Sequence, residues 1–156
     1  MRGKRFLLFA PVFALLFFLS PARAETPSAI ILSSDDHAGA AEERAKVSNG
    51  RMTSAMQDGK PLDRLLAYTP ESPAFFAVAE LESAPPNTKI RFSWIYVTEN
   101  QHIADFDMTN GNHGPDVYVY SNLTNGKNLW PKGEYKTEIY VGGRTDPDQV
   151  IDFEVE

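Results

Sequence analysis

The sequence of 156 residues contains no cysteine and only three histidines. The missing cysteines exclude disulfide bridges, thiolate metal sites, a cysteine nucleophile and a lipid anchor on an N-terminal cysteine. Three histidines leave few candidates for a general base. The sequence also contains no Gly-x-Ser-x-Gly, no His-Glu-x-x-His, no phosphate loop and no dinucleotide fingerprint. We therefore expect a protein that is not an enzyme and that has no cofactor.

Long apolar runs are also lacking. The uncharged, mostly apolar stretch from Phe6 to Ser20 follows three basic residues and precedes Ala22-Arg23-Ala24. As a helix its fifteen residues rise about 22 Å, short of the roughly 30 Å hydrocarbon core. This pattern is typical of a cleaved signal peptide, here residues 1–24, and an uncleaved anchor is the alternative. We expect a periplasmic or secreted protein with no stable membrane anchor after cleavage.

Basic residues are scarce once this segment is removed. Residues 25–156 keep 11 Lys and Arg against 21 Asp and Glu, a net charge of −10. An acidic surface repels phosphate backbones and anionic membrane surfaces. We therefore expect no nucleic-acid partner, and a protein or a glycan as the partner.

The rest of the chain divides into a leader and one domain. Residues 25–46 are polar and acidic apart from Ile30-Ile31-Leu32, and we interpret them as a flexible leader. The length of residues 47–156 is right for a single domain.

From Val47 onward, turn clusters such as Asn49-Gly50 separate short runs in which apolar and polar residues alternate. This period of two is typical of half-buried strands. The apolar rows are Phe75 to Leu81, Ile90 to Tyr96, Val117 with Val119, Tyr135 to Val141, and Ile151 to Val155. Residues 64–68 and 102–108 are weaker candidates. About seven short strands without a long helix predict an all-β fold, an antiparallel β-sandwich.

Two local features refine this prediction. Trp94 lies in the middle of a strand on its core face, and Gly133-Glu134-Tyr135 opens a late strand. Residues of about 73 to 155 resemble the immunoglobulin-like domains of secreted bacterial proteins of unassigned function, through residues 86–94 and 130–135. The resemblance implies an immunoglobulin-like sandwich whose strands from Trp94 onward match C, D, E, F and G, and a tyrosine corner at Tyr135. The two core cysteines of antibody domains are absent, and Thr137 stands at the second position.

Residues 105–116 are the richest in possible metal ligands. The Asp105-Phe106-Asp107 triplet followed by Asn110-Gly111 is similar to a calcium loop, but the glycine comes one residue late and the terminal glutamate is absent. His102, Met108 and His113 are the types of ligand that copper takes. An ordinary Asn/Gly hairpin loop between two strands explains the same residues, so we assign no metal site.

Three further features have a functional and a structural interpretation. Asp146 and Asp148 are spaced as a hydrolase pair or as a solvated turn. Tyr118 and Tyr120 face outward if Val117 and Val119 face inward, either as a binding surface or as good strand formers. Asn122-Leu123-Thr124 is a glycosylation sequon. Our hypothesis is an exported binding module without catalytic residues, and the alternative is a calcium- or copper-binding exported protein that uses residues 105–116.

Overall fold

The computed structural model describes residues 44–156, which form an all-β structure with no helix. The predicted signal peptide, residues 1–24, and the leader residues 25–43 lie outside the described residues. Nothing in the described range is a helix of the length and apolarity that crossing a bilayer requires.

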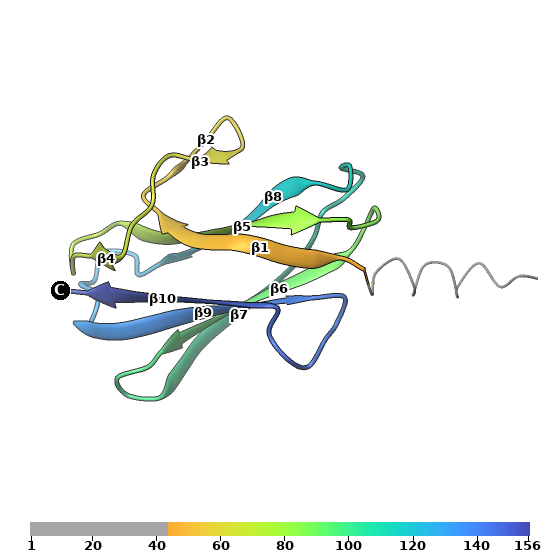
Figure 1. The fold of residues 1–156 in the computed structure, drawn as a ribbon. Helices are drawn as coiled ribbons and strands as arrows, with labels where there is room; N and C mark the ends of the chain where they lie inside the picture. Colours follow the sequence, from red (N-terminus) through yellow and green to blue (C-terminus); the bar gives the residue numbers. More distant parts are fainter. Residues whose placement is uncertain (1–43) are drawn as a thin grey trace, which may run out of the picture. The chain divides into compact units, whose positions relative to one another are not determined.

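The strands form two main sheets and a short hairpin (Figure 1). The three-stranded sheet has the order β1-β5-β8 and is antiparallel throughout: β1 (Lys46–Thr53), β5 (Ala74–Glu82) and β8 (Val117–Thr124). The five-stranded sheet has the order β4-β10-β9-β6-β7: β4 (Ala67–Tyr68), β10 (Gln149–Val155), β9 (Gly133–Val141), β6 (Lys89–Tyr96) and β7 (Gln101–Thr109). Only the two-residue strand β4 pairs in parallel in this sheet. The hairpin joins β2 (Met56–Gln57) to β3 (Lys60–Pro61).

The apolar rows predicted from alternation do form the core between the two main sheets. In β9 and β10 every second side chain is buried, as a half-buried strand requires. Trp94 on β6 is fully buried, and its Nε1 donates a 3.3 Å hydrogen bond to Ser121 Oγ on β8. The ring of Phe75 on β5 lies 5.1 Å from that of Phe153 on β10. These contacts join the two sheets face to face.

Each strand of the smaller sheet lies over a strand of the larger one. On β1, a Cβ added to Gly50 would lie 2.6 Å from the Gln149 side chain of β10, and the Trp94–Ser121 hydrogen bond places β8 over β6. Because the smaller sheet ends at β8, no strand from residues 44–156 covers the inner face of β7. Phe106 and Met108 on that face keep 40% and 37% of their surface exposed. The larger sheet therefore extends beyond the smaller one by one strand.

The corner at the start of β9 forms as predicted. Tyr135 is buried, and its hydroxyl donates a 2.7 Å hydrogen bond to the carbonyl oxygen of Pro131. Gly133 adopts a φ of 137°, a conformation that side chains with a Cβ rarely take. Burial raises the pKa of Tyr135 to about 12 because the low-polarity surroundings disfavour the phenolate.

Two local predictions were wrong. Asn49-Gly50 does not end a strand: it lies within β1, where the register to β5 shifts between Ser48 and Arg51, and Asn49 has a φ of 51°. One extra residue in a paired strand is a β-bulge, which uses the same positive φ as a turn. The strand predicted at 102–108 exists as β7, but it pairs with β6, so it does not take the place beside β8 that the predicted strand order gave it.

Candidate functional site

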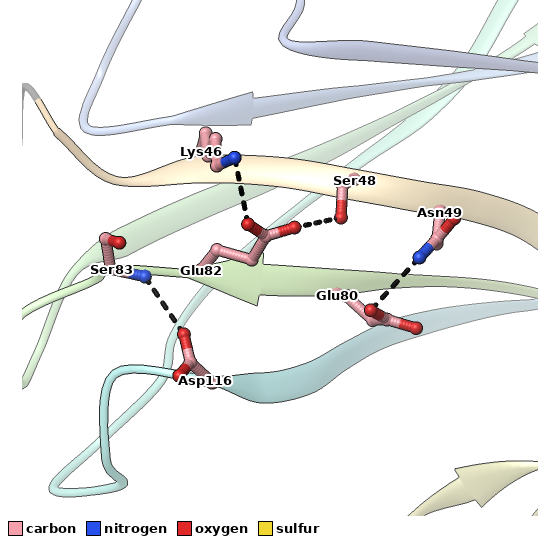
Figure 2. A network of polar contacts seen from close by, with 7 residues as sticks. All are labelled: Lys46, Ser48, Asn49, Glu80, Glu82, Ser83 and Asp116. Carbon is pink, nitrogen blue, oxygen red and sulfur yellow. Dashed lines mark hydrogen bonds and ion pairs between the residues drawn. The ribbon is translucent and has the colours of Figure 1, made fainter.

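A network of polar contacts crosses the outer face of the three-stranded sheet (Figure 2). The Glu82 carboxylate accepts a hydrogen bond from the Ser48 hydroxyl and lies 2.9 Å from Lys46 Nζ. The Ser48 hydrogen bond first, and Lys46 second, lower the pKa of Glu82. Nearer the middle, Glu80 accepts hydrogen bonds from Asn49 Nδ2 at 3.1 Å and from the Tyr118 hydroxyl at 3.0 Å. The network therefore joins β1, β5 and β8 and leaves both glutamates partnered.

The residues proposed as calcium ligands do not converge on one point. Asp105 lies on β7, where its Oδ1 is 2.9 Å from His102 Nε2. Hydrogen bonding from Ser93 and then His102 lowers the pKa of Asp105. Asp107 pairs in register with Arg91, whereas Asp116 Oδ1 accepts the backbone N–H of Ser83 at 3.2 Å. Within residues 44–156, no three His, Asp or Glu side chains gather closely enough to hold a metal ion.

The segment between β7 and β8 is a crossing from one sheet to the other and is not a hairpin loop. Asn110, which is buried, fixes its start. The Asn110 Oδ1 accepts the Thr88 N–H at 2.8 Å, and its Nδ2 donates to the Pro85 carbonyl at 3.0 Å. Asn110, which was predicted to lie in a possible calcium loop, therefore holds the start of this crossing to the backbone of Thr88 and Pro85.

The pair Asp146 and Asp148 occupies the turn between β9 and β10. Asp148 accepts the Val141 N–H at 2.9 Å and is ion-paired with Arg144, while Asp146 is exposed. Asp148 therefore holds the turn together.

The uncovered part of β7 and the free edge of β8 enclose an open groove of about 370 Å³. Met108 and Thr109 line it from β7, Val117 to Tyr120 line it from β8, and Gly59 and His113 line its rim. Its walls are mostly apolar, and the backbone of an edge strand runs along one of them. An edge strand has peptide groups on its free side that no neighbouring strand pairs.

Of the four edges of the two main sheets in the described chain, β8 alone lacks a feature that prevents pairing with another strand. β1 has a bulge, β4 has only two residues, and β7 has exposed Asp105 and Asp107 and a register shift opposite Trp94/Ile95. β8 pairs with β5 in unbroken register over eight residues and contains no charge, proline or glycine. Bulges, charges and short length are the usual means by which natural edges avoid association. The β8 edge is therefore the candidate binding site.

Side chains on the outer face of β8 are accessible. Tyr120 is 44% exposed, and Asn122 of the sequon is exposed two residues farther along. The predicted outward orientation of Tyr120 is confirmed, while Tyr118 is half-buried beside Glu80 and Arg51. The alternating pattern identified these tyrosines as a possible binding surface. It does not predict the order of strands in the sheet, and the open edge beside the tyrosines depends on that order.

Comparisons with known proteins identify no family for this chain. No family model and no curated protein matches the sequence. Among solved structures, the chain is similar to the Pseudomonas fluorescens alkylpurine DNA glycosylase AlkC bound to DNA containing an abasic site analog, with 13% sequence identity and a TM-score of 0.46. The similarity covers 72% of this chain and 30% of the glycosylase.

This finding corrects two expectations. The similar structure is an enzyme and is bound to DNA, which contradicts the predictions that the chain is not an enzyme and has no nucleic-acid partner. Both predictions rested on missing motifs and on net charge, neither of which describes a three-dimensional site, and both are withdrawn. A likeness at this TM-score gives no support for either activity in this chain.

Proposed function

We propose that the chain is an exported, immunoglobulin-like interaction module whose β8 edge accepts an extended segment of another protein. The observation that carries this proposal is the open edge of β8: eight uncharged residues in regular register, beside an apolar groove. Adding a strand to such an edge satisfies its free peptide groups, and the neighbouring pockets select the incoming side chains.

The strand order supports the immunoglobulin-like part of the proposal. In constant-type domains one sheet has strands A, B, E and D, and the other has C, F and G. Here β6 carries the core Trp94 expected of C, β9 carries the Tyr135 corner expected of F, and β8 corresponds to E. β7 lies beside β6, the place of the extra strand C′ in variable-type domains, so no described strand takes the place of D beside β8.

Export is supported by the sequence pattern of residues 1–24, with its basic start, short apolar run and Ala-x-Ala end. The intact mass of the protein recovered outside the cytoplasm tests this part. A mass beginning at Glu25 agrees with it, and a mass that retains residues 1–24 contradicts it.

Site-specific photocrosslinking in the producing cells tests the interaction. A benzoylphenylalanine at Tyr120 keeps an aromatic ring at the β8 edge, and one at Val150, 39% exposed on β10, is the matched control. We expect covalent adducts with another protein from position 120 only, and fewer of them when Met108→Asp places a charge in the groove. Equal adducts from both positions, or none from position 120, would refute the proposed function.

A further inference from the structure

The vacant place beside β8 has a defined shape. One side is the backbone edge of β8 that no described strand pairs, and the floor is the uncovered face of β7, where Met108 lines the groove and Phe106 is exposed on the same face. Building on the proposed function, we infer that its occupant is a single extended segment of a partner protein, apolar at alternate positions and carrying Lys or Arg between them. About eight residues match the length of β8, roughly 26 Å at the rise of a β-strand.

The apolar positions follow from the geometry of a sheet. Successive side chains of a strand point to opposite faces, so every second side chain of the incoming segment faces the inner side of β7. There it lies over Phe106 and Met108, which are 40% and 37% exposed in the chain alone. Burying these two surfaces together with apolar side chains of the segment removes apolar area from water, which favours binding.

The β8 strand of a second copy of this chain does not fit the same place. In each copy β8 already lies over β6, as the Trp94–Ser121 hydrogen bond shows. If the β8 strand of another copy entered the vacant place, its own β6 would have to occupy the space that β7 fills in the first copy. The occupant must therefore have one free face, as an extended segment or tail does.

Charge determines the side chains between the apolar ones. Of the three aspartates from Gln101 to Gly126, Asp116 directly precedes β8, whereas Asp105 and Asp107 alternate with Phe106 and Met108 and so face away from the vacant place. The same stretch contains no Lys or Arg. The whole described domain carries 11 basic against 16 acidic residues, a net charge of −5. On the outer face, the exposed ring of Tyr120 lies on the same strand that Asp116 precedes, and an aromatic face and a carboxylate both attract a cation. Basic side chains thus complement this side of the molecule, and acidic ones are repelled.

Three synthetic eight-residue peptides test the inference on the purified protein. One alternates valine and lysine, the second alternates valine and glutamate, and the third has the four valines and four lysines in two blocks. Titration calorimetry measures their affinities at low and at physiological salt. We expect the alternating lysine peptide to bind at least about tenfold more tightly than either of the others, and its affinity to fall as salt rises.

Matched variants locate the binding. Met108→Asp weakens the alternating lysine peptide at least about tenfold, whereas Val150→Asp, at similar exposure on β10, leaves its affinity unchanged. Thermal melting of both variants verifies that they fold. Equal binding of the lysine and glutamate peptides, equal effects of the two variants, or a dimer in sedimentation that blocks the peptide would overturn the inference. If no peptide binds while crosslinks form at Tyr120, the segment chemistry is wrong and the interaction function stands.

Discussion

Tyr135→Phe isolates the hydrogen bond that fixes the corner before β9. The change keeps the ring, which packs 5.3 Å from Phe153 and 4.7 Å from Tyr96, and removes the hydroxyl that donates to the Pro131 carbonyl. A buried hydrogen bond contributes about 0.5–1.5 kcal/mol, and an orphaned buried partner costs about 1–3 kcal/mol. Because Pro131 lies at the surface, water replaces the phenol at its carbonyl. We therefore expect a loss of about 1 kcal/mol in the free energy of unfolding.

Removing the ring as well costs more. Tyr135→Ala opens a cavity among Phe75, Tyr96 and Phe153, and large-to-small aromatic changes in a core cost about 3–5 kcal/mol. A domain has a total stability of about 5–15 kcal/mol. We therefore expect this variant to fold marginally.

Tyr140→Phe is the matched control on the opposite face of the same strand. Its hydroxyl donates to Glu138 at 2.6 Å, and Glu138 keeps an ion pair with Lys136 at 2.7 Å when that bond is lost. We expect a change below about 0.5 kcal/mol. Urea unfolding followed by tryptophan fluorescence measures all three variants. If Tyr140→Phe costs as much as Tyr135→Phe, the corner hydrogen bond does not stabilise the fold and our account of it is wrong.

Three further changes test other parts of the structure. Gly133→Ala combines a φ of 137° with a Cβ that would lie 2.4 Å from Thr98 Oγ1. We therefore expect the free energy of unfolding, measured in urea, to fall by at least about 1–3 kcal/mol. A neutral result would contradict the close approach. Burial raises the pKa of Tyr68 and of Tyr135 to about 12 in the folded chain, while tyrosines of the unfolded chain ionise near pH 10. The stability that these two groups contribute is therefore complete below pH 10 and falls as the pH rises from 10 to 12, and Tyr135→Phe should make this fall shallower. Hydrogen bonds from the Ser54 side chain and backbone lower the pKa of Asp63. The stability that Asp63 contributes is therefore present above about pH 4 and is lost as the pH falls further. Asp63→Ala should lower the melting temperature at pH 7 more than at pH 3, and an equal effect at both would refute this linkage.

Local patterning predicted the strands because each face of a sheet imposes a period of two on the sequence. Ile90 to Tyr96 and Tyr135 to Val141 alternate as their environments do, and both became core strands. The corner at Tyr135 was expected from the immunoglobulin-like resemblance, and it depends on local sequence because its hydrogen bond spans only four residues.

Pairing between strands is decided by contacts far apart in the sequence, and there prediction from local pattern failed. Asn49-Gly50 has the residues of a turn, but β5 continues beside it and makes it a bulge. Residues 101–109 form a strand whose neighbour could have been β6 or β8, and alternation does not distinguish the two. Because β7 pairs with β6, β8 is left at the edge of its sheet, so the candidate site could not be predicted from the local sequence pattern.

The most direct measurement of the central claim is amide hydrogen exchange, resolved by residue, along β8. In an antiparallel edge strand alternate peptide groups bond to the neighbour and the others face the free side. In the free protein we predict that alternate amides of Val117–Thr124 exchange about as fast as those of exposed loops, and that the alternating valine–lysine peptide slows them at least about tenfold while those of β7 are unaffected. Protection of every β8 amide in the free protein, or slowing on β7 instead of β8, would contradict the claim that β8 is the open binding edge.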